Sequence, residues 1–378
     1  MTADAAEPKT ADRGALAPME VATRSERLRE SVGAAGLDGL LVSNLTNIRY
    51  LTGFTGSSGL LLLSGTGLLL LTDGRYGEQA TAQLAAAGVD ATIEVSASQR
   101  EPLSAAVSAA GIARLGLEAT AVTWADQRDY AATWFPTVEL VATDGLVEAQ
   151  RVVKDDGEVD RIATAAAIAD SAFAQVRHML GEGPTEAEFA IELDMAMRRL
   201  GAEGVSFETI VASGPSAALP HHRPDDRRVR DGDLVVVDFG ALLDGYHSDM
   251  TRTVMIGEPT AVGQRMYDVV LQAQAAGVAA VSAGVAAAEV DSAARAVIDA
   301  AGWADAFLHG TGHGIGLDIH EEPRVGQRST ARLVDRCVVT VEPGVYLPDH
   351  GGVRIEDTVL VTADGCRPLT LTDKLAAV

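Results

Sequence analysis

The stretch LVVVDFGALLDGYHSDMTRTVMI, residues 234–256, decides the fold of the carboxyl-terminal half of the chain. Its first apolar run ends in Asp238, the pair Asp244-Gly245 follows, and a second β-rich run carries Asp249. Two such runs on either side of Asp-Gly are typical of a β-hairpin with a two-residue turn. The stretch therefore predicts two antiparallel strands that each carry an aspartate.

A two-residue turn also predicts the register of this hairpin. Leu243 then pairs with Tyr246 beside the turn, and Asp238 pairs with Thr251 further out. Because strand side chains alternate and the two aspartates are offset by two residues, Asp238 and Asp249 become diagonal neighbours about 7 Å apart at Cα. Both carboxylates then reach a shared pair of metal ions. Strand aspartates are also common on solvated polar faces, so the hairpin alone leaves both interpretations open.

Length and composition limit the class of protein. A chain of 378 residues predicts two domains, and a hydrophobic content of 47% is ordinary for a soluble globular protein. The formal charge of -23 argues against nucleic acid or an anionic membrane as partner, because both bind basic patches. The only two cysteines, Cys337 and Cys366, do not form a disulfide framework, and we expect reduced thiols in a cytoplasmic protein.

No segment has the character of a targeting or membrane sequence. Residues 1–18 are polar and rich in Ala and Pro, which predicts a disordered tail and not a signal peptide. The longest apolar stretch, residues 60–71, is interrupted by Ser-Gly-Thr-Gly and predicts a hairpin, because a membrane span needs about 18 apolar residues. We therefore expect no membrane partner.

Two domains are expected, with the boundary near Arg151. Residues 19–150 alternate between short helices and strands and carry no constellation of ligands, which indicates a small mixed α/β domain. Residues 151–378 begin with two longer helical patterns, the second opened by a capping box of Thr185 and Glu188. The candidate chemistry lies in this second domain.

Histidines gather in two loops of the second domain. The loop SGPSAALPHHRP presents His221 and His222 just before the central hairpin. The glycine-rich stretch HGTGHGIGLDIHEEP carries His309, His313 and His320, and its glycines allow close approach of the backbone. A single His in such a loop is usually a turn residue. Three of them, at intervals of four and seven residues, favour a binding site.

The last segment is predicted to form a second strand pair with two more acids. Glu342 lies in TVEPGVY on the first strand and Glu356 lies in VRIEDTV on the second, each among apolar residues. A carboxylate in such surroundings is costly to bury unless it is paired or bound to a metal. Two strand pairs with two acids each, and a histidine loop between them, predict a dinuclear metal site.

The charges of the candidate ligands agree with two divalent cations. Four carboxylates and a neutral imidazole balance two such ions, and the five residues are Asp238, Asp249, His313, Glu342 and Glu356. Oxygen and imidazole ligands without thiolate favour manganese, which we expect first, or cobalt, zinc or iron. Two ions about 3.5–4 Å apart hold a bridging water, lower its pKa and polarise a carbonyl, which predicts a hydrolase.

The quoted segments, together with RYLTGFTGS and DGRY near the amino terminus, resemble a known family. They are similar to the proline-directed metallopeptidases of the pita-bread fold, the Xaa-Pro aminopeptidases and Xaa-Pro dipeptidases (prolidases) of peptidase family M24. The similarity extends from about Met19 onward. It implies an α/β (α+β) chain in which a small mixed, creatinase-like amino-terminal domain precedes a pita-bread catalytic domain.

The resemblance also implies a role for each site residue. It makes the five residues above the metal ligands, with Asp249 and Glu356 bridging the two ions. Glu342 is then also the proton shuttle between the attacking water and the leaving nitrogen. His221 and His320 are then the histidines that bind the substrate carbonyl. Arg354 and His309 line or support the site, and His222 is expected to lie behind it.

The implied reaction is attack of a metal-bridging hydroxide on the carbonyl carbon that precedes proline. The resemblance favours an Xaa-Pro aminopeptidase acting on peptides with proline in the second position, with an Xaa-Pro dipeptidase restricted to dipeptides as the alternative. It further implies a homodimer or a larger homo-oligomer.

Three other hypotheses share the fold. Creatinase lacks the metal ligands, and methionine aminopeptidase lacks the domain ahead of Arg151. A non-catalytic pita-bread module that binds partners is expected to have lost ligands. Metal content and peptide turnover distinguish such a module from an enzyme.

Overall fold

The computed structural model describes residues 16–374 and 377, and these fold into two units. One unit is Met19–Arg151, and the other comprises the residues from Val152 onward with the short segment before Met19. Most of the predicted disordered tail, residues 1–15, lies outside the described residues. Within the described part of that tail, the Ala17 N–H donates to Asp160 Oδ2 at 2.8 Å.

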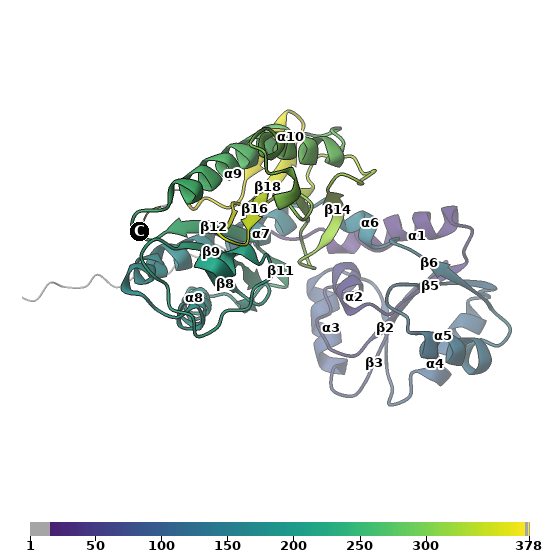
Figure 1. Ribbon diagram of the computed structural model, residues 1–378. Helices are drawn as coiled ribbons and strands as arrows, with labels where there is room; N and C mark the ends of the chain where they lie inside the picture. The colour runs from purple at the N-terminus through teal and green to yellow at the C-terminus, as the bar shows by residue number, and fades with distance from the viewer. Residues whose placement is uncertain (1–15, 375–376, 378) are drawn as a thin grey trace, which may run out of the picture. The chain divides into compact units, whose positions relative to one another are not determined.

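The amino-terminal domain is a mixed α/β unit, coloured purple to blue in Figure 1. Its elements are η1 (Val21–Thr23), α1 (Arg24–Ala34), β1 (Gly39–Val42), α2 (Leu45–Thr52), β2 (Leu60–Ser64), β3 (Gly67–Thr72), α3 (Gly77–Ala86), β4 (Thr92–Val95), α4 (Arg100–Ala109), β5 (Arg114–Glu118), α5 (Trp124–Asp129), η2 (Tyr130–Trp134), β6 (Glu139–Thr143) and α6 (Glu148–Arg151).

Six of these strands form one sheet in the order β4-β3-β2-β1-β5-β6. The leucine-rich hairpin predicted over residues 60–71 is confirmed as β2 and β3, which pair Leu60 with Leu71 and Ser64 with Gly67. Strand β4 pairs in parallel with β3, β5 with β1, and β6 with β5. Burial of leucines from β1, β2 and β3 against helix α4 forms the core of this domain.

The carboxyl-terminal domain contains the central hairpin and all the predicted site residues. Its elements are α7 (Asp156–Val176), η3 (Arg177–Glu182), α8 (Glu186–Arg199), β7 (Gly204–Val205), β8 (Ile210–Ser213), η4 (Gly214–Ala218), β9 (Leu234–Phe239), β10 (Ala241–Leu243), β11 (Tyr246–His247), β12 (Met250–Met255), α9 (Ala261–Ala279), α10 (Ala287–Ala300), η5 (Ala304–Ala306), β13 (Gly312–Gly314), β14 (Glu321–Val325), β15 (Val338–Val341), β16 (Gly344–Leu347), β17 (Gly351–Arg354), β18 (Asp357–Thr362) and β19 (Gly365–Pro368).

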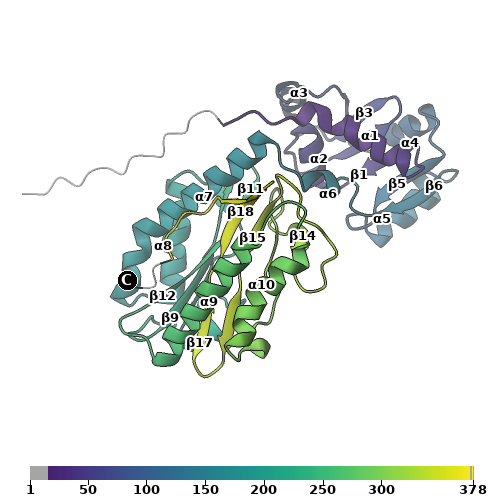
Figure 2. The same ribbon diagram turned by 90° about the horizontal axis from the view of Figure 1, so that it is seen from above.

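Helices cover both sides of the strands in this domain. Helices α7 and α8 contact β7, β8, β10 and β11, whereas α9 contacts β15, β16 and β17, and α10 packs on α9 and β14. Figures 1 and 2 show α9 and α10 side by side over one face, with α8 on the other side of the strands. The capping box predicted at the start of α8 is confirmed, because Thr185 and Glu188 exchange hydrogen bonds.

The predicted register of the central hairpin is confirmed. Leu243 pairs with Tyr246 beside the turn, and Asp238 pairs with Thr251. The ladder is interrupted between these two pairs, at Gly240, where the hairpin passes from the sheet β12-β9-β8 to the sheet β11-β10-β7. The register is the same on both sides of the interruption, which places Gly240 across from Asp249.

The second acidic strand pair differs from the sequence-based expectation. Glu342 follows β15 instead of lying on it, and Glu356 lies between β17 and β18. The pairs β15–β18 and β16–β17 belong to different sheets. The reason is that the two glutamate N–H groups leave the ladder: Glu342 donates to Thr311 O at 2.7 Å and Glu356 donates to Thr251 O at 3.1 Å.

Among residues 16–374 and 377, no helix combines the length and apolar character that crossing a membrane requires.

Gly240 is expected to tolerate no side chain. A Cβ at this position would lie 1.9 Å from Ser248 O, so Gly240→Ala forces the two hairpin strands apart. We expect it to lower the free energy of unfolding by about 1–3 kcal/mol, as overpacking does in other cores. Urea unfolding of the metal-free protein measures the change.

Gly204→Ala is the matched control, because Gly204 lies on the neighbouring strand β7 and its Cβ would meet no atom closer than 3.8 Å. An equal loss of stability in both variants would show that the close approach at Gly240 is not the cause.

Candidate active site

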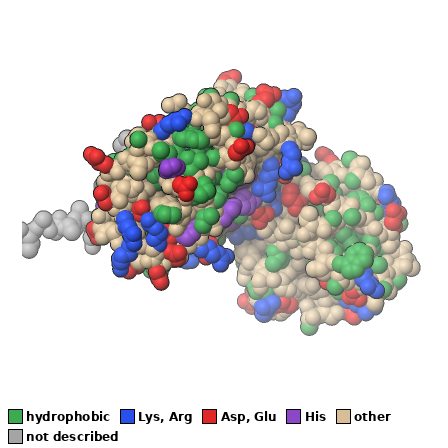
Figure 3. Space-filling view, in the orientation of Figure 1, with side chains coloured by type: hydrophobic (Ala, Val, Ile, Leu, Met, Phe, Trp, Pro, Cys, Tyr) green, Lys and Arg blue, Asp and Glu red, His purple; other side chains and the backbone are tan. Residues whose placement is uncertain are grey.

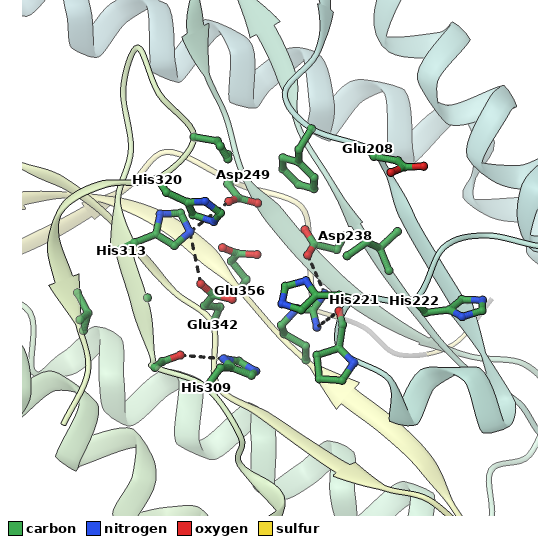
Figure 4. Close-up of a pocket in the computed structure, with 18 of the residues that line it drawn as sticks. Glu208, His221, His222, Asp238, Asp249, His309, His313, His320, Glu342 and Glu356 are labelled. Carbon is green, nitrogen blue, oxygen red and sulfur yellow. Dashed lines mark hydrogen bonds and ion pairs between the residues drawn. The ribbon is translucent and has the colours of Figure 1, made fainter. Parts of the chain in front are cut away.

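A cavity of about 660 Å³ opens in the carboxyl-terminal domain, and histidine side chains gather along the hollow seen in Figure 3. The predicted site residues are distributed over six separate segments of the chain, yet all of them line this cavity: His221, His222, Asp238, Asp249, His309, His313, His320, Glu342, Arg354 and Glu356. Figure 4 shows most of them directed toward its centre, with His222 as the exception.

The five predicted metal ligands come together at the inner end of the cavity. Carboxylate oxygens of Asp238, Asp249 and Glu356 lie within 4.8 Å of one another. His313 Nε2 lies 3.6 Å from Asp249 Oδ2 and 3.5 Å from Glu342 Oε1. Four carboxylates and one imidazole therefore surround one small space.

Local structure explains how Glu342 and Glu356 reach this space. Because their N–H groups bond to segments outside their own strand pair, each residue sits at a break in its ladder and its side chain turns inward. Two threonine hydroxyls then orient the carboxylates. Thr251 donates to Glu356 Oε2 at 2.7 Å, and Thr340 donates to Glu342 Oε1 at 3.3 Å.

The acids strongly perturb one another. Burial, followed by the charges of Glu356 and Asp238, raises the pKa of Asp249 well above its usual value. Burial and the charges of Glu342 and Asp238 raise the pKa of Glu356 in the same way. Burial raises the pKa of Glu342 to about 8, although Arg354 acts in the opposite direction. Without added positive charge, Glu342 therefore retains its proton near neutral pH, and Asp249 and Glu356 keep theirs to a higher pH than usual.

Arg354 is the cation that contacts this cluster directly. Its Nη2 donates to Asp238 Oδ2 at 2.7 Å, and its side chain is only 4% exposed. Its Nε also donates to Thr251 Oγ1 at 3.1 Å. One guanidinium does not neutralise four carboxylates, so the site lacks positive charge.

Two further observations fit the binding of metal ions. Asp238 Oδ1 and Glu356 Oε1 are buried and have no hydrogen-bond partner among the described residues. Burial lowers the pKa of His313 to about 4, so its imidazole is neutral, and its Nδ1–H donates to Gly314 O at 2.9 Å. The Nε2 lone pair consequently faces the carboxylates. That contact is repulsive unless a cation lies between them, and the arrangement is the usual one for a metal-binding histidine.

His320 and His221 face the cavity with exposed side chains. The ring of His320 packs edge-on against His313, with centroids 4.4 Å apart. Burial, followed by the charge of Arg324, lowers the pKa of His320. His221 forms no hydrogen bond or ion pair with another described residue that would hold its ring in place. Both imidazoles are therefore available to a ligand in the cavity.

His309 is turned away from the carboxylates and supports Arg354. Burial and the charge of Arg354 lower the pKa of His309 to about 4, so the ring is neutral. Its Nδ1–H donates to Gly310 O at 2.8 Å, which leaves Nε2 to accept from the Tyr346 hydroxyl at 2.8 Å. Arg354 Nη1 in turn donates to the Tyr346 oxygen at 2.8 Å. A chain of hydrogen bonds thus fixes Arg354 against Asp238.

Sequence reasoning missed Tyr346 and a buried ion pair behind the site. Lys154 Nζ lies 2.9 Å from Glu321 Oε2, and the two side chains are 1% and 7% exposed. Glu321 Oε1 also accepts from the Asp318 N–H at 3.1 Å. These contacts hold the segment that ends in His320. Tyr346 lies in the quoted motif TVEPGVY, but Lys154 is 167 residues from Glu321 and no local pattern indicates their pairing.

Comparison with known proteins places this geometry in a family. The model of metallopeptidase family M24 matches residues 160–363, and the model of the creatinase/prolidase N-terminal domain matches residues 24–153. The chain belongs to metallopeptidase family M24. Both the predicted family and the predicted pairing of a creatinase-like domain with a pita-bread catalytic domain are confirmed.

Individual relatives cover most of the chain. It is 43% identical over 236 residues to an Xaa-Pro dipeptidase of Pyrococcus furiosus, which is 62% of this chain and 68% of the relative. The solved Xaa-Pro dipeptidase from Bacillus anthracis has 39% identity and a TM-score of 0.90, covering 94% of this chain and 99% of that one. The solved X-Pro aminopeptidase from Thermotoga maritima has 37% identity and a TM-score of 0.85, covering 94% and 100%.

Metal binding is expected to release protons from the site. Glu342 has a pKa of about 8 in the metal-free protein, so it is protonated near pH 7 but must ionise to act as a ligand. Titration of the metal-free protein with Mn²⁺ should therefore release protons, and should release fewer at about pH 9 than near pH 7. Calorimetry in buffers of different ionisation enthalpy measures this release.

The same raised pKa predicts the stability of the metal-free protein. A group with a raised folded-state pKa favours the fold while it is protonated, so stability should fall as the pH rises through about 8. Glu342→Gln removes this group and should reduce both effects. Proton release that is the same at both pH values would contradict the assignment.

Proposed function

We propose that this protein is an Xaa-Pro dipeptidase that uses two divalent metal ions. The observation that carries the proposal is the convergence of four carboxylates, of which Asp249 and Glu356 are buried, and a neutral histidine on one space, with two exposed histidines beside it. The sequence analysis preferred an Xaa-Pro aminopeptidase. The solved dipeptidase and the dipeptidase relative reported above favour the dipeptidase alternative instead.

In this proposal five clustered side chains would hold the metal ions: Asp238, Asp249, His313, Glu342 and Glu356. Their hard oxygen donors and one imidazole suit manganese first, or cobalt, zinc or iron. The buried oxygens Asp238 Oδ1 and Glu356 Oε1, which lack partners in the described part of the chain, support these assignments. When bound, the ions supply an activated water and polarise the substrate carbonyl.

His221 and His320 are proposed to bind the carbonyl oxygen of the residue before proline. The lowered pKa of His320 leaves its imidazole neutral at pH 7, with one N–H to donate. Hydrogen-bond donors aimed at an oxygen that gains negative charge stabilise the transition state more than the substrate. Their exposure in the cavity suits that role.

Glu342 is proposed to move the proton. Its carboxylate takes a proton from the attacking water and delivers it to the leaving nitrogen. The nitrogen of an Xaa-Pro bond carries no N–H, and with this proton it leaves as a neutral secondary amine instead of as an amide anion. Thr340, which donates to Glu342 Oε1, holds the carboxylate in place for both transfers.

Arg354 and His309 are proposed to support this machinery. Arg354 fixes Asp238 Oδ2 and leaves the other oxygen of that carboxylate directed into the site. His309 acts on Arg354 through Tyr346. Because the Asp238 carboxylate is already fixed, less conformational entropy is lost when metal and substrate bind.

An Xaa-Pro aminopeptidase that accepts longer peptides is the second candidate. A cavity of about 840 Å³ adjoins the first and shares His309, Gly310, Arg324 and Gly326 with it, which offers room for a residue beyond proline. The solved X-Pro aminopeptidase from Thermotoga maritima also favours this candidate.

The cytoplasmic setting and the homo-oligomeric assembly expected from the sequence are part of this proposal. Cys337 and Cys366 are both free thiols, which supports a reducing, cytoplasmic environment. We propose a homodimer or larger homo-oligomer acting on peptides with proline in the second position.

Two substrates distinguish the candidates. Metal-stripped protein with Mn²⁺ restored should release proline from an Xaa-Pro dipeptide much faster than it releases Xaa from an Xaa-Pro-Yaa tripeptide. Chromatography of the products measures both rates. Efficient cleavage of the tripeptide would make the protein an aminopeptidase.

Asp249→Asn is the control for metal-dependent turnover, because it removes a proposed metal-binding carboxylate with little change in shape. It should abolish cleavage and reduce bound metal. If the parent protein binds metal but cleaves neither peptide with any of the four metals, the proline-directed proposal fails and a binding module becomes the better account.

A further inference from the structure

His222 points away from the cavity while its neighbour His221 points into it (Figure 4). His222 Nε2 lies 2.6 Å from Glu186 Oε2, and the side chain is 12% exposed. Because a carboxylate only accepts hydrogen bonds, Nε2 carries the proton in this contact. The partner, Glu186, lies at the start of α8, where the positive end of the helix dipole favours a negative side chain.

Glu186 is fully buried and contacts the histidine loop at three points. Its Oε1 accepts from both the N–H and the hydroxyl of Ser213, where the loop begins, at 2.7 and 2.6 Å. Its Oε2 accepts from His222 in the middle and, at 3.4 Å, from the Asp225 N–H near the end. One carboxylate therefore connects the entry, centre and exit of the loop.

The backbone of α8 fixes the end of the same loop. The Glu186 N–H donates to Arg227 O at 2.9 Å, and the Ala187 N–H donates to Asp225 O at 3.1 Å. These are N–H groups that a helix start leaves without partners inside the helix. The loop thus ends on a rigid element, and His222 is tied to that element through Glu186.

His221 lies between two residues that are held by hydrogen bonds, but its own ring is not held by any described residue. Its side chain is exposed and makes no hydrogen bond or ion pair with the described residues. On one side, the Pro220 carbonyl accepts from Arg354 Nη1 at 3.3 Å. On the other side, His222 is held by Glu186. The direction of the His221 ring consequently depends on the backbone that its two neighbours hold.

We propose that Glu186 and His222 are positioning residues that aim His221 at the substrate carbonyl. The inference rests on the proposed role of His221 in an Xaa-Pro peptidase, and it adds a residue from α8 to that reaction. Small misplacements of a catalytic group reduce rates strongly. Glu186 and His222 should therefore affect the rate of cleavage measurably, although neither points into the cavity.

A metal site is the other explanation for this cluster, because ligand atoms of Glu186, His222 and Asp225 lie within 4.8 Å of one another. Both oxygens of Glu186 already accept hydrogen bonds from the protein, so the buried acid has no unmet need for a cation. Hydrogen bonding alone accounts for the arrangement.

His222→Phe tests the proposal by removing Nε2 while keeping a ring of similar size. Metal-loaded protein with this change should lose about 10- to 100-fold in kcat/KM for Xaa-Pro, with its metal content unchanged. His222→Gln, which retains an N–H donor, should recover part of that loss. In a His221→Ala background the His222→Phe change should have little further effect, because there is no imidazole left to aim.

Glu188→Gln is the matched control. Glu188 belongs to the capping box in the same turn of α8 and is exposed; its carboxylate contacts Thr185 and, at 3.7 Å, the exposed Arg228 just after the loop, so the change weakens the start of the helix without removing a contact of Glu186 or His222. It should leave kcat/KM unchanged. If it lowers activity as much as His222→Phe does, or if His222→Phe keeps its full effect without His221, the pair has only a structural role and the proposal is wrong.

A crystal structure of the His222→Phe variant provides a readout that needs no turnover. The His221 ring should be displaced or lose a single position, while the five clustered ligand side chains stay in place. An unchanged His221 overturns the positioning proposal. Failure of the parent protein to cleave Xaa-Pro overturns the proposed function instead, and the crystal structure then still decides whether His222 places His221.

Discussion

Mutual repulsion among four clustered carboxylates, two of them buried, is the constraint on which the rest of this structure depends. Asp238, Asp249, Glu342 and Glu356 share one small space, and in the described part of the chain only the Arg354 guanidinium contacts them directly. Isolated buried charges are costly, so such a cluster persists only with protons or cations to offset the charge. The raised pKa values and the two buried oxygens that have no hydrogen-bond partner among the described residues are two consequences of the same deficit of positive charge.

Both acidic hairpins meet this constraint with the same structural device. Each is a continuous strand pair whose ladder is interrupted where an acid must turn inward, at Gly240 across from Asp249 and at the opposed residues Glu342 and Glu356. At the second interruption the freed N–H groups bond to Thr251 on β12 and to Thr311 just before β13, which joins the sheets around the site. The breaks in the ladders therefore let the acids point into the site, and the register that continues across each break keeps the acids opposite their partners.

The sequence predicted those features that local chemistry determines. Asp244-Gly245 permits one tight turn, and the turn fixed the register of the central hairpin correctly. Apolar runs do not reveal where a ladder is interrupted, and for that reason Glu342 and Glu356 were predicted to lie on the two strands instead of at the break between them. Contacts between distant segments, such as Lys154 with Glu321 or Glu186 with His222, have no local signal at all.

These distant contacts follow one principle. The clustered ligands are held by sheets, whereas the two exposed histidines lie on loops, and their own rings make few contacts. In each case the residue next to the histidine is held by a buried partner from another element: Glu321 by Lys154, and His222 by Glu186. A buried ion pair contributes little net stability after desolvation, but it does restrict geometry. Such pairs allow an exposed imidazole to keep a defined direction while its ring remains open to substrate.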